Sequence, residues 1–199
     1  KGIRIEDQSK EEYLARRTFQ ETDPPEHRIT RKMVNPAFSR PAIQGYEALV
    51  REMAADVLDS ALVQAEIDGV DTIAKQLPML MLGQILGLPR DDLDWLVEKG
   101  DALIGNSDPD FTDFVIDKID SDAYRLMPFR SPAGADLYDY ADKVITGDKK
   151  VSGDGVLARV LGTADPGMSP SDFKNFFCLL IAAGNDTTRY SIAMSLYRL

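Results

Sequence analysis

Small, acidic and hydroxyl side chains follow a strongly apolar stretch near the end of the 199-residue sequence. Residues 179–183 are all apolar, and Gly184, Asp186, Thr187 and Thr188 come soon after them. A carboxylate buried without a partner is costly, and a helical glycine costs about 1 kcal/mol relative to alanine. Thr187 can return its hydroxyl to a carbonyl one turn back, and a ligand or water there would loosen the helical ladder. These residues predict either a functional notch or a merely polar kink.

A long helix must carry this segment. Ser169, Pro170 and Asp172 form a capping-box pattern, which predicts a helix from about residue 170 to residue 199. No proline interrupts it, so its length is about 45 Å at 1.5 Å per residue. Its first half has almost no polar face, which predicts burial on all sides. The apolar run is shorter than the about 20 residues that a bilayer requires.

A second pair of chemical groups lies near the start of the chain. Asp23 and Pro24 predict a cap and a first helical position, with Glu26 closing the box. His27 and Arg31 then lie four residues apart, on one face of that helix, where both can point donors at one anion. The alternative is that His27 is an ordinary surface residue.

Helical patterns account for most of the remaining chain, and strand signals are nearly absent. The sequence therefore predicts an all-α fold and one domain, or one piece of a domain, over residues 1–199. Further helices are expected at about residues 9–19, 41–66, 71–88 with an interruption at Pro78, 89–104, 133–146 and 154–161.

Composition excludes some classes of partner and compartment. The 33 acidic and 23 basic residues give a net charge of −10, which argues against nucleic acid and anionic membranes. A single cysteine excludes an internal disulfide, and residues 1–30 lack a signal-peptide pattern, so a cytoplasmic location is expected. Residues 1–40 hold nine basic and seven acidic residues. The basic residues expected to be exposed are Arg16, Arg17, Arg28 and Lys32. They could either dock a partner or simply solvate the helices that carry them.

Two ordered motifs resemble those of one family. The segment Ala183-Gly184-Asn185-Asp186-Thr187-Thr188 is similar to the oxygen-groove motif in the central helix of the cytochromes P-450, the haem-thiolate monooxygenases. Upstream, the segment from Asp23 to Arg31 resembles the Asp-Pro-Pro-x-His-x-x-x-Arg sequence of the bacterial members. The resemblance implies a partial cytochrome P-450 fold around a long central helix.

The resemblance also implies a function and a role for each site residue. Haem b iron would activate dioxygen in the groove at Ala183 and Gly184, with electrons from NAD(P)H through a ferredoxin-type redox partner. Thr187 would hold a water on the bound oxygen, and Asp186 would relay protons to that water. In the upstream motif, the histidine and the arginine, His27 and Arg31, would bind the haem propionates. One oxygen atom would enter a small apolar substrate.

Some family features do not occur in these 199 residues. The Glu-x-x-Arg helix and the loop with the iron-ligating cysteine are absent, so the axial ligand would lie outside this chain. Cys178 lies in an apolar run and is expected to be a buried, protonated thiol instead. Residues 106–111 resemble a loop of members that oxidise terpenoid, steroid or branched-alkyl substrates. The alternative is a non-catalytic all-α module that binds an apolar ligand or a protein, which added haemin and absorption spectroscopy would distinguish.

Overall fold

Helices make up all the regular structure that the computed structural model describes, which covers residues 7–116, 118–163 and 167–199. The predicted all-α fold class is therefore confirmed. The α-helices are α1 (Lys10–Arg16), α2 (Glu26–Val34), α3 (Arg40–Gly45), α4 (Glu47–Leu62), α5 (Gln76–Leu86), α6 (Leu93–Ile104), α7 (Pro132–Thr146), α8 (Val156–Leu161) and α9 (Pro170–Tyr197). The shorter helical segments are η1 (Phe19–Glu21), η2 (Asn35–Phe38), η3 (Val70–Ala74), η4 (Arg90–Asp92), η5 (Asp122–Tyr124) and η6 (Pro128–Arg130).

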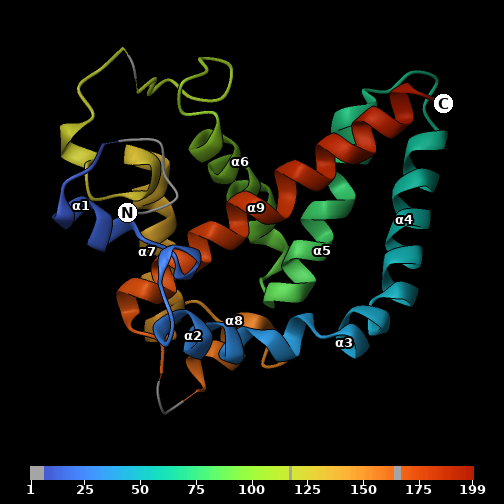
Figure 1. Ribbon diagram of the computed structural model, residues 1–199. Coiled ribbons are helices and arrows are strands. Elements are labelled where there is room, and N and C mark those ends of the chain that lie inside the picture. Colours follow the sequence, from blue (N-terminus) through green and yellow to red (C-terminus); the bar gives the residue numbers. More distant parts are fainter. Residues whose placement is uncertain (1–6, 117, 164–166) are drawn as a thin grey trace.

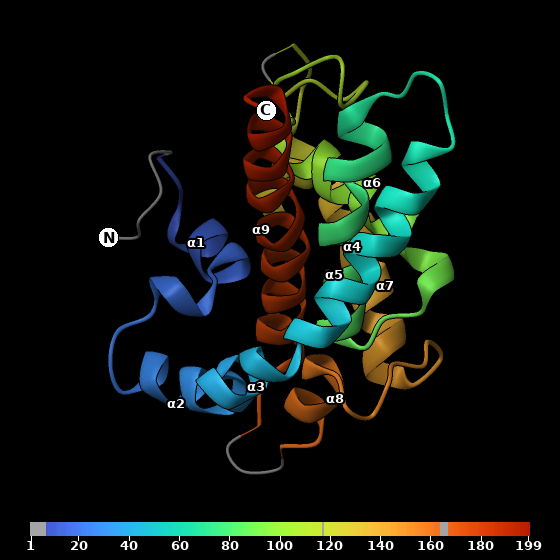
Figure 2. The same cartoon turned by 90° about the vertical axis from the view of Figure 1, so that its right-hand side faces the viewer.

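The long helix begins and ends close to the predicted positions. The Ser169 side chain accepts a hydrogen bond from the Asp172 amide at 3.1 Å, so the predicted cap is present. Figure 1 shows α9 crossing the molecule from the region of α7 and α8 toward the far end of α4. In Figure 2, α9 lies between α1 on one side and α4, α5 and α6 on the other.

Three helices, α5, α6 and α7, pack directly against α9 and form the core with it. Apolar side chains fill the space between them because each helix turns one apolar stripe inward. The innermost members are Leu96, Val97 and Leu103 of α6, Leu137 and Ala141 of α7, and Phe173, Phe176, Phe177 and Ile181 of α9. The first half of α9 is buried, as predicted. The second half is not, and Ala183, Thr187 and Thr188 are exposed.

Two glycines permit close approach of neighbouring helices to α9. A Cβ atom on Gly184 would lie 2.6 Å from Leu82 Cδ1 of α5, and one on Gly100 of α6 would lie 3.1 Å from Ile181 Cγ2. The first distance is shorter than any normal carbon contact, so Leu82 packs directly on the bare backbone of α9.

Three predicted boundaries are wrong. Helix α2 begins at Glu26 and has no side-chain cap, although the Asp23 carbonyl accepts a hydrogen bond from the His27 amide at 3.1 Å. The helix expected over residues 41–66 is divided at Tyr46 into α3 and α4. Pro78 interrupts nothing, because it lies in the first turn of α5, where a missing amide hydrogen leaves no hydrogen bond unmade.

Candidate functional site

The motif on α9 lies in a continuous helix. Thr187 Oγ1 donates to the Ala183 carbonyl at 3.2 Å, as the sequence analysis expected. One turn later, the Ser191 hydroxyl donates to the Thr187 carbonyl at 2.9 Å. Both bonds turn hydroxyl groups back onto the helix, so the exposed Thr187 side chain has a defined direction and an oxygen atom that can still accept a hydrogen bond.

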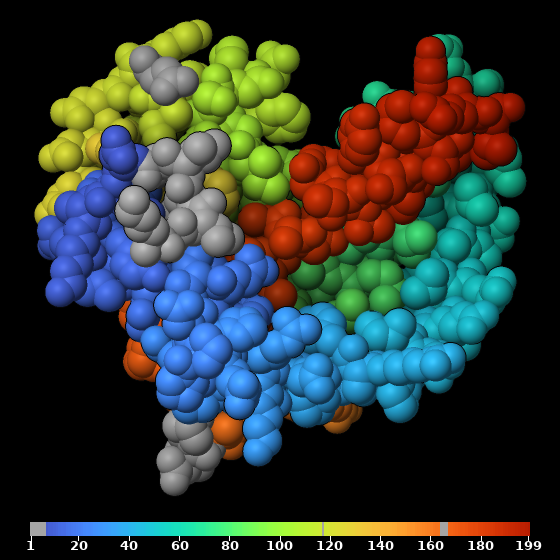
Figure 3. All heavy atoms as spheres, in the orientation of Figure 1, coloured from blue at the N-terminus to red at the C-terminus, as the bar shows by residue number. Residues whose placement is uncertain are grey.

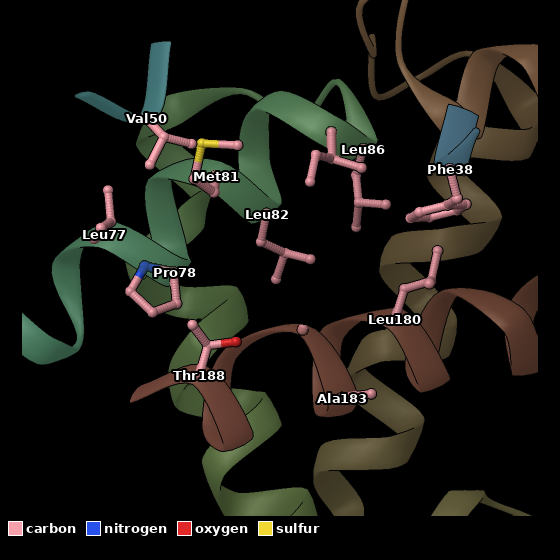
Figure 4. A pocket seen from close by; sticks show the side chains of 12 residues that line it. Phe38, Val50, Leu77, Pro78, Met81, Leu82, Leu86, Leu180, Ala183 and Thr188 are labelled. Carbon is pink, nitrogen blue, oxygen red and sulfur yellow. The ribbon is translucent and has the colours of Figure 1, made fainter. Parts of the chain in front are cut away.

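Apolar hollows lie on both sides of this motif. The first, here called the α5 groove, has a volume of about 400 Å³ and lies between α9 and α5. Figure 3 shows it as an open depression beside α9, with α5 at its floor, and Figure 4 shows its side chains. It is lined by Phe38, Val50, Leu77, Pro78, Met81, Leu82, Ile85, Leu86, Leu180, Ala183, Gly184 and Thr188.

The second hollow, here called the α1 cavity, has a volume of about 610 Å³ and lies between α9, the region of α1 and η1, and the end of α6. Ala183 lines both hollows, whereas Asp186 and Thr187 line only the α1 cavity. The motif therefore separates the two hollows. The α1 cavity is lined by Arg16, Thr18, Gln20, Glu21, Ile104, Pro128, Phe129, Asn175, Cys178, Leu179, Ala182, Ala183, Asp186 and Thr187.

A basic hollow of about 510 Å³ follows the exposed face of α2, and both His27 and Arg31 line it. The His27 ring stacks on Phe19 with a centroid distance of 5.9 Å, and Phe19 meets Phe176 of α9 edge-on at 6.0 Å. This aromatic chain fixes α2 relative to α9. Arg31 is exposed, and in the described part of the chain its guanidinium has no acidic partner.

One of the expected surface cations is buried. Arg16 has only 2% of its surface exposed, because the last turn of α1 packs against α9. The carbonyl of the neighbouring Ala15 accepts a hydrogen bond from Asn175 Nδ2 at 2.9 Å, which holds this turn in place. Arg17 is half-buried and pairs with Glu26 at 2.6 Å. Of the four cations expected to be exposed, only Arg28 and Lys32 are, and both line the basic hollow.

Asp186 belongs to an ion-pair cluster that the sequence analysis missed. Arg189 Nη2 donates to Asp186 Oδ1 at 2.8 Å, and Arg189 Nη1 donates to Asp101 Oδ2 of α6 at 2.7 Å. Burial opposes the charge on Arg189. The hydrogen bonds that its guanidinium donates to both carboxylates outweigh this effect and raise the pKa of Arg189. The three-residue spacing of Asp186 and Arg189 on a helix could have predicted the first pair. Nothing local could have predicted Asp101.

Cys178 is a buried structural thiol, as the sequence indicates. Only 3% of its surface is exposed, and burial raises its pKa well above the ordinary value. A cysteine thiol must lose its proton to ligate a metal ion, and this buried environment opposes that loss. In the described residues, no group of three or more histidine, cysteine or acidic side chains is placed to hold a metal ion.

Asn185 is buried with 3% exposure, and its amide nitrogen and oxygen have no hydrogen-bond partner. An unsatisfied buried amide costs about 1–3 kcal/mol. We therefore expect Asn185→Leu to raise the free energy of unfolding by about 1–2 kcal/mol in urea titrations followed by circular dichroism. Asn175→Leu is the matched control and should lower that free energy, because Asn175 bonds both Ala15 and Tyr138. A loss of stability in Asn185→Leu would mean that an internal water satisfies the amide.

The residues present fit a haem group. Haem b is a flat, largely apolar ring with two carboxylates on one edge. The apolar hollows on both sides of Ala183 suit the ring, since this position carries only a methyl group. His27 and Arg31, which has no acidic partner among the described residues, could offer hydrogen-bond donors to the carboxylates.

None of the helices formed by the described residues combines the length and the apolar character that a membrane crossing requires.

No family model matches the chain. Comparison with individual proteins does find relatives. The chain is 34% identical to cytochrome P450 126 of Mycobacterium tuberculosis, over 89% of the chain and 41% of that protein. It is 26% identical to the steroid C26-monooxygenase of Mycolicibacterium smegmatis, over 90% of the chain and 39% of that enzyme.

Solved structures agree with these relatives. A Mycobacterium marinum cytochrome P450 in complex with pseudoionone superposes with a TM-score of 0.78 and 26% sequence identity, over 96% of this chain and 45% of that one. The chain thus spans about two fifths of the length of the curated relatives it matches. With the two motifs and the helical architecture in agreement, the chain belongs to the cytochrome P450 family.

Proposed function

We propose that the chain is part of a haem-dependent monooxygenase that inserts one oxygen atom of O2 into an apolar substrate. Within it, these 199 residues would supply the oxygen-groove helix and the haem-propionate contacts. The observation that carries this proposal is the position of Ala183, at the junction of two apolar hollows, with Asp186 and Thr187 facing the larger one. When bound, haem b would supply the activation of dioxygen, and the axial thiolate would come from outside these residues.

Each motif residue has a part that follows from its environment. Ala183 leaves room beside the helix because its side chain is a single methyl group, whereas Leu82 fills the space beside the Gly184 backbone. Thr187 has an oriented hydroxyl at the edge of the α1 cavity, where it would hold a water molecule. Asp186 lines the same cavity and is half-buried, so it would exchange protons between solvent and that water.

The α1 cavity supports an apolar substrate. The surface that lines it is mostly apolar and includes the side chains of Ile104, Phe129 and Leu179. Among its relatives is an enzyme named for the oxidation of a steroid at C26. We propose a terpenoid, steroid or branched-alkyl substrate for the whole enzyme. Electrons would come from NAD(P)H through a ferredoxin-type partner in the cytoplasm, and the exposed Arg28 and Lys32 would suit an acidic partner.

The roles of His27 and Arg31 can be tested directly. In the full-length enzyme, we expect Arg31→Ala to weaken haem retention by about 1.5–3 kcal/mol, the range for a charged hydrogen bond. His27→Ala should cost less, because the ring also stacks on Phe19. The measurement is the rate of haem transfer to a scavenging apoprotein.

Arg51→Ala is the matched control, because Arg51 is exposed on α4, pairs with Glu47 and lines neither of the apolar hollows nor the basic hollow. It should leave the rate of haem transfer unchanged. The assignment of His27 as a propionate donor would be wrong if His27→Ala altered the axial-ligand absorption spectrum at unchanged haem content.

The competing function is a non-catalytic helical module that binds an apolar ligand or a protein. It would account for the apolar hollows, but it leaves the oriented Thr187 and the cationic face of α2 without a purpose. Addition of haemin to the chain separates the two functions. A saturable change in the haemin absorption spectrum that Arg31→Ala weakens supports the monooxygenase, and no change supports the module.

A further inference from the structure

Arg189 connects two carboxylates that belong to different helices. Asp101 and Arg189 are each 14% exposed, whereas Asp186 is 42% exposed at the edge of the α1 cavity. One guanidinium therefore serves two acids, and the cluster has a net charge of −1. Each carboxylate reduces the attraction that the other experiences, because the same positive charge must balance both.

Asp101 is fixed independently of Arg189. It lies in the last turn of α6, where the helix dipole disfavours a negative charge. The close contact of Gly100 with Ile181 holds this part of α6 against α9. Arg189 thus offsets an unfavourable charge that the packing of the helices has already placed. The geometry leaves Asp186 as the more exposed of the two acids.

We propose that Arg189 is the positioning residue of Asp186, and that Asp101 sets the strength of this hold by competing for the same guanidinium. The inference rests on the proposed function, in which Asp186 exchanges protons with a water held by Thr187. A carboxylate held by a full positive charge would take up a proton too reluctantly. Asp101 weakens the hold and keeps Asp186 available for proton exchange.

The other charges near Asp186 leave this competition intact. Helix α5 carries no charged residue, and η3 carries only the exposed Asp71. On the α7 side, Asp142 pairs with Lys174 at 3.1 Å, which is twelve residues or about 18 Å along α9 from Asp186. Also on α6, Glu98 is exposed and Lys99 pairs with Asp136 of α7 at 2.8 Å.

Across the α1 cavity, Arg16 and Glu21 contribute one charge of each sign. No ion pair joins either of them to Asp186 in the described residues, and each has partners of its own. The balance at Asp186 is therefore set mainly by Arg189 and Asp101.

The proposal predicts shifts of opposite sign in two variants of the full-length enzyme. Arg189→Gln should raise the pH at which the Asp186 side-chain carboxyl titrates, because the positive charge is lost. Asp101→Asn should lower that pH, because Arg189 then serves Asp186 alone. The readout is the carbon-13 signal of the carboxyl in aspartate-labelled protein with a diamagnetic haem, assigned by its absence in Asp186→Asn. The pH profile of oxygen consumption should shift in the same two directions.

The matched control is Asp136→Asn, which breaks the cross-helix pair with Lys99 without touching Arg189. It should lower stability and leave the Asp186 signal unchanged. If Arg189 only fastens α6 to α9, both test variants lower stability, neither moves the titration, and the inference is overturned. If Asp186→Asn itself leaves oxygen consumption unchanged, the proton-exchange role in the proposed function fails, which is a separate result.

Discussion

Thr187→Ala is expected to divert most of the electrons consumed by the full-length enzyme into hydrogen peroxide instead of product. The substitution removes the hydroxyl that is oriented by the Ala183 carbonyl at the edge of the α1 cavity, and it leaves the helix intact. Asn175 is another uncharged polar side chain of α9 in the cavity, but its amide is already bonded to Ala15 and Tyr138. Oxygen should still be reduced at a similar rate. Reductant consumed, peroxide formed and product formed should be measured side by side.

Two controls make this result specific to one hydroxyl group. Thr187→Ser keeps a hydroxyl that can bond the same carbonyl, so it should retain most of the coupling. Thr188→Ala removes the adjacent exposed threonine, which lines the α5 groove and not the α1 cavity, so it should leave coupling unchanged. Equal ratios of peroxide to product in wild type and Thr187→Ala would reduce Thr187 to an ordinary helix residue.

Asp186→Asn should instead slow oxygen consumption itself, by about 10²-fold, the lower end of the usual contribution of general acid–base catalysis. The asparagine oxygen can still accept the hydrogen bond from Arg189, so the side chain keeps its place. It cannot gain or lose a proton, so the relay to the cavity is broken. The measurement is the rate of oxygen consumption with saturating substrate and reductant, in H2O and in D2O.

Asp142→Asn serves as the control for Asp186→Asn, because Asp142 also pairs with a cation near α9 but lies outside the α1 cavity. It should leave the rate and the solvent isotope effect unchanged. A normal rate in Asp186→Asn, or a rate loss without a larger solvent isotope effect, would assign proton delivery to another group.

Local signals explain which parts of the fold could be predicted from the sequence. Ser169, Pro170 and Asp172 determine the start of α9 within a single turn, so that boundary was predicted correctly. The Ser9 cap of α1 is equally local, and its capping box with Glu12 is present. The start of α2 was missed because Pro24 and Pro25 form a turn before the helix instead of its first residues.

Features that depend on distant segments could not be predicted in this way. Arg16 lies between two half-buried residues in the sequence, and no local pattern distinguishes it as the buried one. Asp101 and Arg189 are 88 positions apart, and their ion pair requires the contact between α6 and α9. The motif residues Ala183, Asp186 and Thr187 do lie together at one cavity, and the catalytic and haem-binding roles assigned to them stay predictions.

The two glycine contacts of α9 also restrict how the molecule can open. Leu82 of α5 packs against the α9 backbone at Gly184, and Ile181 of α9 packs against the α6 backbone at Gly100. Sliding α9 along its axis would have to break both contacts at once, so they fix the position of α9 relative to α5 and α6. Any widening of the α1 cavity would therefore have to come from its other walls, the region of α1 and η1 and the loop around Phe129.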